Sequence, residues 1–378
     1  MAKITEIIGE LPNKMGEKNY VEDLNIDMIK GLDTENMYQL LTDYGQHIQN
    51  AINNAVSITH SNITPTLKNI KDIYILGIGG SAMAGELLKN YLKYTLKNNS
   101  LNIEIIRWTN TYTKIKKDAL VFCCSYSGNT YETLKALQYV KQFTNNIIAI
   151  TSGGKLEDIA TNENYELLKL PTGMMPRCAV FYGFFHLLYK FFTLNIIKKT
   201  DENKIKKSIK TILTNEFSTS LDYSAINNMN IAIALARNCY YKAPVIYTGA
   251  ERLEAVNLRW KAQIQENANN LCFGNYFPEV NHNEINGFLA PIDILEYFII
   301  IAIKDIEDSD DLNIGITNSL NLLREEYFEV IEVVVAGETL LERIIRLVCL
   351  ADWTSFYLAI ISKKDPTPIP LIARLKRN

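Results

Sequence analysis

The sequence predicts an α/β protein in which short buried strands alternate with helices. KDIYIL, ALVFCC and NIIAIT are short apolar runs, and helical stretches such as GELLKNYLKYTL and YETLKALQYVKQF follow them. Strands that are apolar at nearly every position are buried on both faces, and this is typical of parallel βαβ units covered by helices. The fold class predicted is therefore a parallel sheet with helices on both faces.

The same alternation occurs again in the second half of the chain. APVIYTG reads as a strand, AERLEAVNLRWKAQIQENA as a long helix, and EYFIIIAIKD and EVIEVVVAG as two further strands. The opening of this half, VIYTGAERLEAV, is weakly similar to IYILGIGGSAMAGELL in the first half. This similarity leaves two interpretations open, a duplicated fold and two unrelated α/β halves.

The length of 378 residues fits two domains. We expect an N-terminal helical segment over residues 1–65, because ENMYQLLTDYGQHIQNAINNA has apolar residues at helical spacing. We expect the first α/β domain over residues 66–200 and the second over residues 226–378. The charged stretch at 201–225 is predicted to connect them, with some helix.

Composition excludes several classes of protein. With 47% hydrophobic and 21% charged residues, neither bulk disorder nor a coiled coil is expected. A net charge of −3 is poor for general nucleic-acid binding. Residues 178–197 imitate a membrane span but contain His186 and Lys190, which favours a buried or dimer-interface helix. The N-terminus MAKITEIIGELPNK lacks the pattern of a secretory signal, so we expect a cytoplasmic protein with no membrane partner.

Cysteine and histidine usage predicts no metal site. The six cysteines form no CxxC pair, and the four histidines have no metal-ligand spacing. Reduced core thiols fit the apolar neighbours of the cysteines. We therefore expect neither a metal nor another cofactor.

A glycine loop follows the first strand, with Gly77, Gly79, Gly80 and Ser81 in sequence. Glycines let the backbone approach an anion, and the following helix offers free N–H groups at its start. Gly77, Gly79 and Ala82 nearly fit the dinucleotide fingerprint, but that site also needs an acid after the second strand, which ends IIRWTN. Tight packing between strand and helix is the alternative explanation of these glycines.

A second loop, SYSGNT at residues 125–130, places three hydroxyl groups and a glycine after the strand ALVFCC. Ser125, Ser127 and Thr130 can wrap a phosphate with O–H and N–H donors. The alternative is a helix cap, because Asn129 and Glu132 have the spacing of a capping box. The density of hydroxyl groups exceeds what a cap needs and favours a phosphate site.

Three further residues are candidates that the pattern alone leaves open. Arg177 begins a strongly apolar helix and either reaches a pocket or lies at the surface. Glu266 lies opposite the apolar stripe that contains Trp260 and Ile264, as a solvated helical glutamate also would. His282 lies in FPEVNHNEINGF, a loop rich in hydrogen-bonding residues, where it has either a catalytic task or none.

Taken together, GIGGSAMAG, CSYSGNT and PRCAV resemble the sugar isomerase fold, a flavodoxin-like module that binds phosphosugars. QENAN, FPEVNHNEI, DWTSFYLA and DPTPIPLIARLK resemble one branch of it, the bifunctional phosphoglucose/phosphomannose isomerase family. The similarity runs from about residue 30 to the C-terminus. It implies two sugar isomerase subdomains and an aldose–ketose isomerase that acts on glucose 6-phosphate, fructose 6-phosphate and mannose 6-phosphate.

The resemblance also implies roles for individual residues. Glu266 is the expected base, Arg177 stabilises the enediolate, and His282 opens the sugar ring from the other subunit of a homodimer. Lys376 is expected near the ring oxygen, and Thr367 near C2 and C3. The residues expected to bind the rest of the substrate, mainly its phosphate, are Gly79, Gly80, Ser81, Ser125, Ser127 and Thr130.

These roles agree with the chemistry of the reaction. One carboxylate can move a proton between two adjacent carbons, a cation can stabilise the enediolate, and a histidine can serve the ring oxygen. No metal or redox cofactor is needed for these steps. The alternatives are a non-catalytic sugar-phosphate regulator and an amino-sugar phosphate isomerase of the same fold; a dinucleotide oxidoreductase is more distant. The regulator has no use for Glu266, Arg177 and His282 together.

Overall fold

The computed structural model describes residues 24–59, 70–96, 101–108, 114–213, 219–224, 230–250, 252–326 and 328–376, together with a short strand at Ile7–Ile8. The chain forms two compact units. The first unit is Gly45–Leu213, and the second combines Met1–Tyr44 with Thr214–Asn378. The boundaries of the four segments predicted from the sequence are not tested by this division into two units and stay a prediction.

The first unit contains a five-stranded parallel sheet in the order β3-β2-β4-β5-β6. Its strands are β2 (Asp72–Leu76), β3 (Asn102–Ile106), β4 (Leu120–Cys124), β5 (Ile147–Thr151) and β6 (Glu166–Lys169). Counted from β2, this is the order 2-1-3-4-5 of flavodoxin-like folds. All residues of the central strands β4 and β5 are buried, as their uninterrupted apolar sequences predict.

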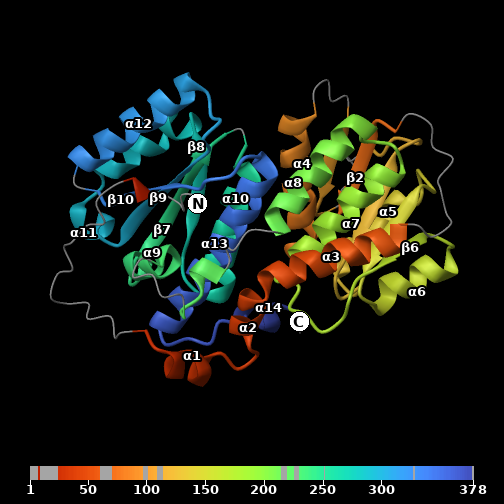
Figure 1. The fold of residues 1–378 in the computed structure, drawn as a ribbon, viewed down its shortest axis with the longest axis horizontal. Helices are drawn as coiled ribbons and strands as arrows, with labels where there is room; N and C mark the ends of the chain where they lie inside the picture. Colours follow the sequence, from red (N-terminus) through yellow and green to blue (C-terminus); the bar gives the residue numbers. More distant parts are fainter. Residues whose placement is uncertain are drawn as a thin grey trace. The chain divides into compact units, whose positions relative to one another are not determined.

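Helices cover both faces of this sheet (Figure 1). The helices are α3 (Tyr44–Thr59), α4 (Gly80–Thr95), α5 (Tyr131–Val140), α6 (Gly154–Asn162), α7 (Val180–Thr193) and α8 (Lys199–Leu213). Side chains of α5 and α6 pack with Tyr74, Val121 and Cys123 on one face. On the other face Gly85 of α4 lies against Ile75, where an added Cβ would come within 3.0 Å of that side chain.

The second unit repeats most of this topology. Its sheet has the order β1-β10-β9-β7-β8, and β7 to β10 are parallel. The strands are β1 (Ile7–Ile8), β7 (Ala243–Gly249), β8 (Phe273–Phe277), β9 (Phe298–Lys304) and β10 (Val330–Val334). Counted from β7, the parallel strands follow the order 2-1-3-4, the same as in the first unit. This agreement favours the duplicated fold that the sequence left open.

Two strands of the second unit were missing from the sequence prediction. The predicted N-terminal helical segment is confirmed by α1 (Ile26–Leu32) and α2 (Met37–Thr42) and by α3, but the sequence analysis did not predict β1, which pairs antiparallel with β10. A strand of two residues is too short to produce a periodic pattern. The edge strand β8 reads FGNYF, and its polar and glycine residues hide it, because an edge strand that is partly exposed needs no continuous apolar run.

Helices also cover both faces of the second sheet. The longer ones are α9 (Ile231–Cys239), α10 (Glu254–Asn267), α12 (Asp310–Glu325) and α13 (Leu340–Ile361). The shorter elements are α1 (Ile26–Leu32), α2 (Met37–Thr42), η1 (Thr219–Leu221), η2 (Glu279–His282), η3 (Glu284–Leu289), α11 (Ile292–Leu295) and α14 (Pro370–Leu375). In Figure 1 the sheet separates α12 from α10 and α13.

Two strongly apolar helices are core elements of their units. Residues 178–197 were predicted to form a buried or dimer-interface helix, and α7 within them is a buried helix, since most of its residues are buried. Within the described ranges, α13 is the one helix long and apolar enough to cross a membrane. All of its 22 residues are buried, which is the environment of a core helix.

The core of the first unit holds two ionisable side chains on α7. The Lys190 ammonium pairs with Glu166 of β6, and both side chains are at most 6% exposed. Burial raises the pKa of Glu166, although the hydrogen bond from Lys190 opposes this shift. His186 is fully buried, its Nδ1 lies 2.6 Å from the Tyr182 carbonyl, and burial lowers its pKa to about 4.

We expect Lys190→Met to lower the free energy of unfolding of the first unit by about 3–5 kcal/mol, because it leaves the buried Glu166 carboxylate unpaired. The matched control is Lys141→Met, which removes an ion pair to Glu163 whose side chains are 39% and 45% exposed. That change should cost less than about 1 kcal/mol. Urea unfolding at pH 7 measures both free energies. Equal decreases in the two variants would show that the buried ion pair stabilises the fold no more than the exposed one.

Candidate active site

The carboxyl end of the first sheet gathers the two loops that the sequence singled out. α4 begins after Gly79 and α5 begins after Thr130, and neither start is capped by a side chain. Uncapped helix starts present N–H donors and the positive end of the helix dipole. An anion can therefore bind between these two loops.

The hydroxyl groups of the SYSGNT loop lie beside these helix starts. Ser125 is 1% exposed, and its Oγ lies 2.8 Å from Oγ1 of Thr130. Ser127 is exposed, and its Oγ accepts a hydrogen bond from the Asn129 N–H at 3.3 Å. The Tyr126 N–H donates to Oγ of Ser81 at 3.3 Å and so joins the hydroxyl loop to the glycine loop. The structure thus brings these predicted phosphate ligands together.

The capping box predicted as an alternative is not formed. The N-cap of α5 is Thr130, with no side-chain cap, so Asn129 does not cap this helix. Instead, Oδ1 of Asn129 accepts the Lys155 N–H in the first turn of α6 at 3.1 Å. The loop therefore closes the start of the neighbouring helix and leaves the start of α5 open to a ligand.

Two glycines set the shape of this loop cluster. Gly128 has φ +66°, and an added Cβ would lie 1.7 Å from the Gly153 carbonyl oxygen. Gly80 leaves no room for a Cβ either, since that atom would lie 2.8 Å from the Pro176 carbonyl oxygen. Gly79 has φ +56° and faces open space. The glycine loop therefore lies directly against the segment that carries Arg177.

Arg177 is 6% exposed, which excludes the surface position that the sequence left open. It lies in the turn before α7. A small pocket begins beside it, lined by Gly80, Ser81, Tyr126 and Pro176 among other residues. The first unit thus places the hydroxyl groups at the two helix starts close to the segment that carries the buried Arg177.

Glu266 lies in the last turn of α10, where it is half-buried. On the face of α10 opposite the apolar stripe, Arg259 is buried against α13, which Trp260 of the stripe also contacts. Arg259 donates to Asp352 at 2.9 Å, and the indole N–H of Trp260 donates to the Leu347 carbonyl at 3.0 Å. The glutamate therefore projects from a helix that is fixed on both sides.

His282 does not lie beside Glu266 in the second unit. It ends η2 and is exposed. The η2 and η3 segment packs with α12 on the face of the sheet that carries Tyr247, and Tyr247 donates to Glu284 at 2.7 Å. α10 lies on the opposite face, where Asn257 donates to the Ile246 carbonyl at 2.9 Å. The sheet itself separates His282 from Glu266.

Thr367 and Lys376 lie in the C-terminal segment after α13. Thr367 is half-buried, and its N–H donates to Asp365 at 2.9 Å. The next residue, Pro368, accepts a hydrogen bond from Nδ2 of Asn269 at 3.4 Å, which places this segment at the end of α10. Lys376 follows α14 and is exposed. Thr367, but not Lys376, is therefore held close to the helix that carries Glu266.

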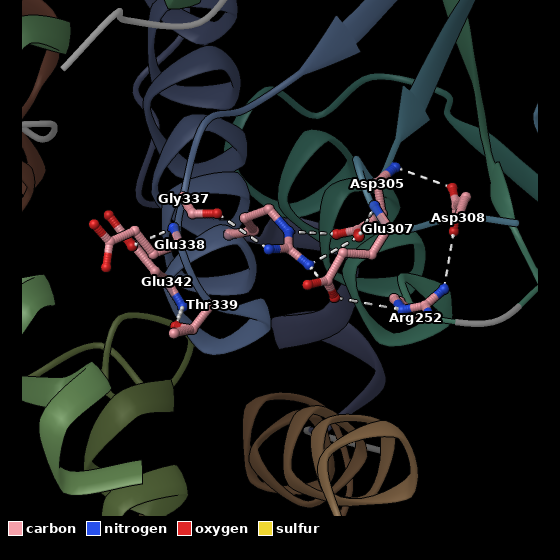
Figure 2. A network of polar contacts seen from close by, with 9 residues as sticks. Arg252, Asp305, Glu307, Asp308, Gly337, Glu338, Thr339 and Glu342 are labelled. Atoms are coloured by element: carbon pink, nitrogen blue, oxygen red, sulfur yellow. Dashed lines mark hydrogen bonds and ion pairs between the residues drawn. The ribbon is translucent and has the colours of Figure 1, made fainter. Parts of the chain in front are cut away.

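The carboxyl end of the second sheet carries a charge network that the sequence analysis missed. Figure 2 shows Asp305, Glu307 and Asp308 from the loop after β9, with Arg252 nearby. Arg343 donates to Asp305 at 2.8 and 2.9 Å and to Glu307 at 2.8 Å. The next helix, α12, is capped by Ser309. The loop after β9 corresponds to the SYSGNT loop after β4. Because it is acidic and Arg343 is already paired with its carboxylates, it does not suit an anion.

Comparison with known proteins finds two family matches, one in each unit of the chain. Residues 66–173 match the SIS domain family, and residues 228–378 match the bacterial phospho-glucose isomerase C-terminal SIS domain. A bifunctional phosphoglucose/phosphomannose isomerase from Caldicellulosiruptor bescii is 32% identical over 342 residues, which cover 90% of this chain and 98% of the relative. The chain belongs to the bifunctional phosphoglucose/phosphomannose isomerase family. The resemblance inferred from the sequence is thereby confirmed.

The chain is also similar to two proteins with other names. A D-glucosamine-6-phosphate 4-epimerase from Sulfolobus acidocaldarius is also 32% identical, over 58% of this chain and 65% of the relative. The C-terminal domain of glucosamine-fructose-6-phosphate aminotransferase from Francisella tularensis has a TM-score of 0.66 at 15% identity. The match covers 93% of this chain and all of that domain, and at this identity it shows the shared fold alone.

We expect Gly128→Ala to weaken the binding of inorganic phosphate at least tenfold, because its Cβ collides with the Gly153 carbonyl and must move the hydroxyl loop. The control is Gly45→Ala in the same unit, where an added Cβ meets no atom within 4 Å. The readout is the rise in melting temperature with phosphate concentration. If the melting temperature of Gly128→Ala rises with phosphate as much as that of the control, phosphate does not bind at this loop.

Proposed function

We infer that this chain interconverts glucose 6-phosphate with fructose 6-phosphate, and mannose 6-phosphate with fructose 6-phosphate. The observation that carries this inference is the phosphate cradle of the first unit. There, the hydroxyl groups of Ser81, Ser125 and Thr130 gather at uncapped helix starts beside Arg177. The family of the chain supports the same substrates and reaction.

The proposed reaction transfers one proton between C1 and C2 through a cis-enediolate. Glu266 removes the proton from one carbon and returns it to the other, which a single carboxylate can do when both carbons lie within its reach. The Arg177 guanidinium stabilises the negative charge that develops on the enediolate oxygens. Because the base and the cation supply this chemistry, we propose that no metal takes part.

The remaining proposed roles concern ring opening and the choice of epimer. His282 exchanges a proton at the ring during its opening, because an imidazole ring can both donate and accept a proton. Lys376 assists at the ring oxygen. Thr367 lies near C2 and C3, and a small side chain there leaves room for both C2 epimers. Gly79, Gly80 and Ser127 complete the contacts to the substrate phosphate.

We propose that the active enzyme is a cytoplasmic homodimer in which His282 acts on the site of the other subunit. The sheet that separates His282 from Glu266 within one chain supports this arrangement. The segment from Leu271 to Tyr297, which contains His282, also carries several exposed apolar side chains, which a second copy could cover. They are Leu271, Phe273, Tyr276, Leu289, Ile292, Ile294 and Tyr297, between 38% and 71% exposed.

A second candidate function is an isomerase or epimerase of amino-sugar phosphates. The 32% identity with the D-glucosamine-6-phosphate 4-epimerase favours it, because the two chains share the phosphate-binding fold over 222 residues. Such an enzyme would bind the phosphate in the same cradle and act on another carbon of the sugar. Glucosamine 6-phosphate therefore belongs in the substrate panel beside the hexose 6-phosphates.

We expect purified protein in EDTA to convert fructose 6-phosphate and mannose 6-phosphate to glucose 6-phosphate, measured as NADPH with glucose-6-phosphate dehydrogenase.

Glu266→Gln should lower kcat at least a thousandfold, because the amide cannot accept the proton. Its thermal stabilisation by fructose 6-phosphate should persist. A Glu266→Gln enzyme with near wild-type kcat refutes the base assignment. A wild-type protein that binds sugar phosphates without turning them over indicates the regulator, and turnover of glucosamine 6-phosphate alone indicates the amino-sugar enzyme.

Mixing two inactive variants tests whether the site is shared between subunits. We expect Glu266→Gln and His282→Ala homodimers to be nearly inactive, since each lacks one group at every site. Their heterodimers should contain one complete site, and co-expression should restore up to about a quarter of the wild-type kcat per subunit, since only half the dimers are mixed. Mixed dimers purified with two different tags and still inactive would show that both residues act within one subunit.

A further inference from the structure

The C-terminal end of α10 is held by a lysine to which the sequence analysis assigned no role. Nζ of Lys364 donates to the Ala268 carbonyl at 3.1 Å and to the Asn269 carbonyl at 3.0 Å. These carbonyls follow the last turn of α10, two and three residues after Glu266. Asn269 has φ +47°, a left-handed conformation that ends the helix there.

A lysine in this position satisfies groups that the helix cannot satisfy itself. The last carbonyls of an α-helix have no partner within the helix, and they form the negative end of its dipole. Lys364 donates to the carbonyl of the C-cap residue Ala268 and to that of Asn269, the residue after it, so it holds the chain at the point where α10 ends. Without it, the chain just after the turn that carries Glu266 would lose these two hydrogen bonds, and the end of the helix could unwind at low cost.

The same lysine begins the segment that carries Thr367. α13 ends in a left-handed residue, Lys363 with φ +56°, which turns the chain back so that Lys364 reaches α10. Three residues later, Thr367 lies in a turn held by Asp365. A second bond between the two elements runs from Asn269 to the Pro368 carbonyl. The segment that carries Thr367 is thus joined to the end of α10 by the contacts of Lys364 before it and of Pro368 after it.

We propose that Lys364 is a positioning residue that fixes Glu266 relative to Thr367 and thereby sets the balance between the two C2 epimers. This inference rests on the proposed function of both residues. In the isomerisation, the base delivers its proton to one or the other face of C2. The relative rate for the two epimers depends on where the base lies with respect to the side chain that limits the space around C2. Lys364 controls that relation without touching the substrate.

The clearest test compares Lys364→Met with Lys364→Arg and Lys261→Met. Met keeps the length of the side chain and removes the donors, whereas Arg keeps them. Lys261 lies on α10 itself, and within the described residues it has no hydrogen bond or ion pair. We expect Lys364→Met to lower kcat about tenfold, with KM changed less than twofold, since small displacements of a catalytic group are costly and the phosphate cradle is intact.

The ratio of the two substrates separates positioning from a general loss of structure. The ratio of kcat/KM for mannose 6-phosphate to that for fructose 6-phosphate should change at least threefold in Lys364→Met. It should return to within twofold of wild type in Lys364→Arg, and Lys261→Met should leave it unchanged. A uniform loss with an unchanged ratio, or a Lys364→Met enzyme with wild-type kinetics, would overturn the proposal.

Hydrogen exchange gives a readout that does not depend on activity. In Lys364→Met the amides of the last turn of α10 should exchange at least tenfold faster, while those of α12 keep their wild-type rates. Unchanged exchange in that turn overturns the proposal even if the enzyme is active. If the wild-type protein does not isomerise hexose phosphates, the proposed function fails, and faster exchange would leave Lys364 as a clamp on α10 without a role in epimer choice, which equally overturns the proposal.

Discussion

Every α-helix leaves about four N–H groups at its start and four carbonyls at its end without partners in the helix. In this chain, two helix starts in the first unit and two helix ends in the second unit satisfy those groups in different ways. In the first unit, the starts of α4 and α5 carry no side-chain cap, and hydroxyl groups gather around them. In the second unit, Ser309 caps α12 and Lys364 closes the end of α10. Open helix starts suit an anion, and a closed helix end holds its last turn, here the turn that carries Glu266, in place.

The two sheets illustrate how one topology can serve both purposes. Four parallel strands follow the same order in each unit, so the loop after β9 corresponds to the loop after β4. After β4 the chain supplies neutral hydroxyl groups, whereas after β9 it supplies Asp305, Glu307 and Asp308. Carboxylates repel a phosphate, and Arg343 is already paired with them. The fold therefore offers two equivalent edges, and the side chains leave only the first suited to a phosphate.

Much of the fold was predictable because buried parallel strands are apolar at nearly every position, as β4 and β5 are. The strands β1 and β8 were not predictable, since one has two residues and the other is a partly exposed edge strand with a polar and glycine-rich sequence. The hydroxyl loop was recognisable from its composition. The burial of Arg177 and the contact of Gly80 with Pro176 depend on segments far apart in sequence, so only the structure reveals them.

The positions of Glu266 and His282 show most clearly why a site cannot be read from the sequence alone. Only 16 residues separate them in the chain, and this spacing alone does not say on which face of a sheet each one lies. However, the edge strand β8 passes between them, and the chain leaves it on the face opposite to α10. The sheet thus keeps the two groups apart within one chain, in agreement with the proposal that His282 acts on the site of a second copy. Under this proposal, the exposed apolar side chains between Leu271 and Tyr297 are the surface that the second copy would cover.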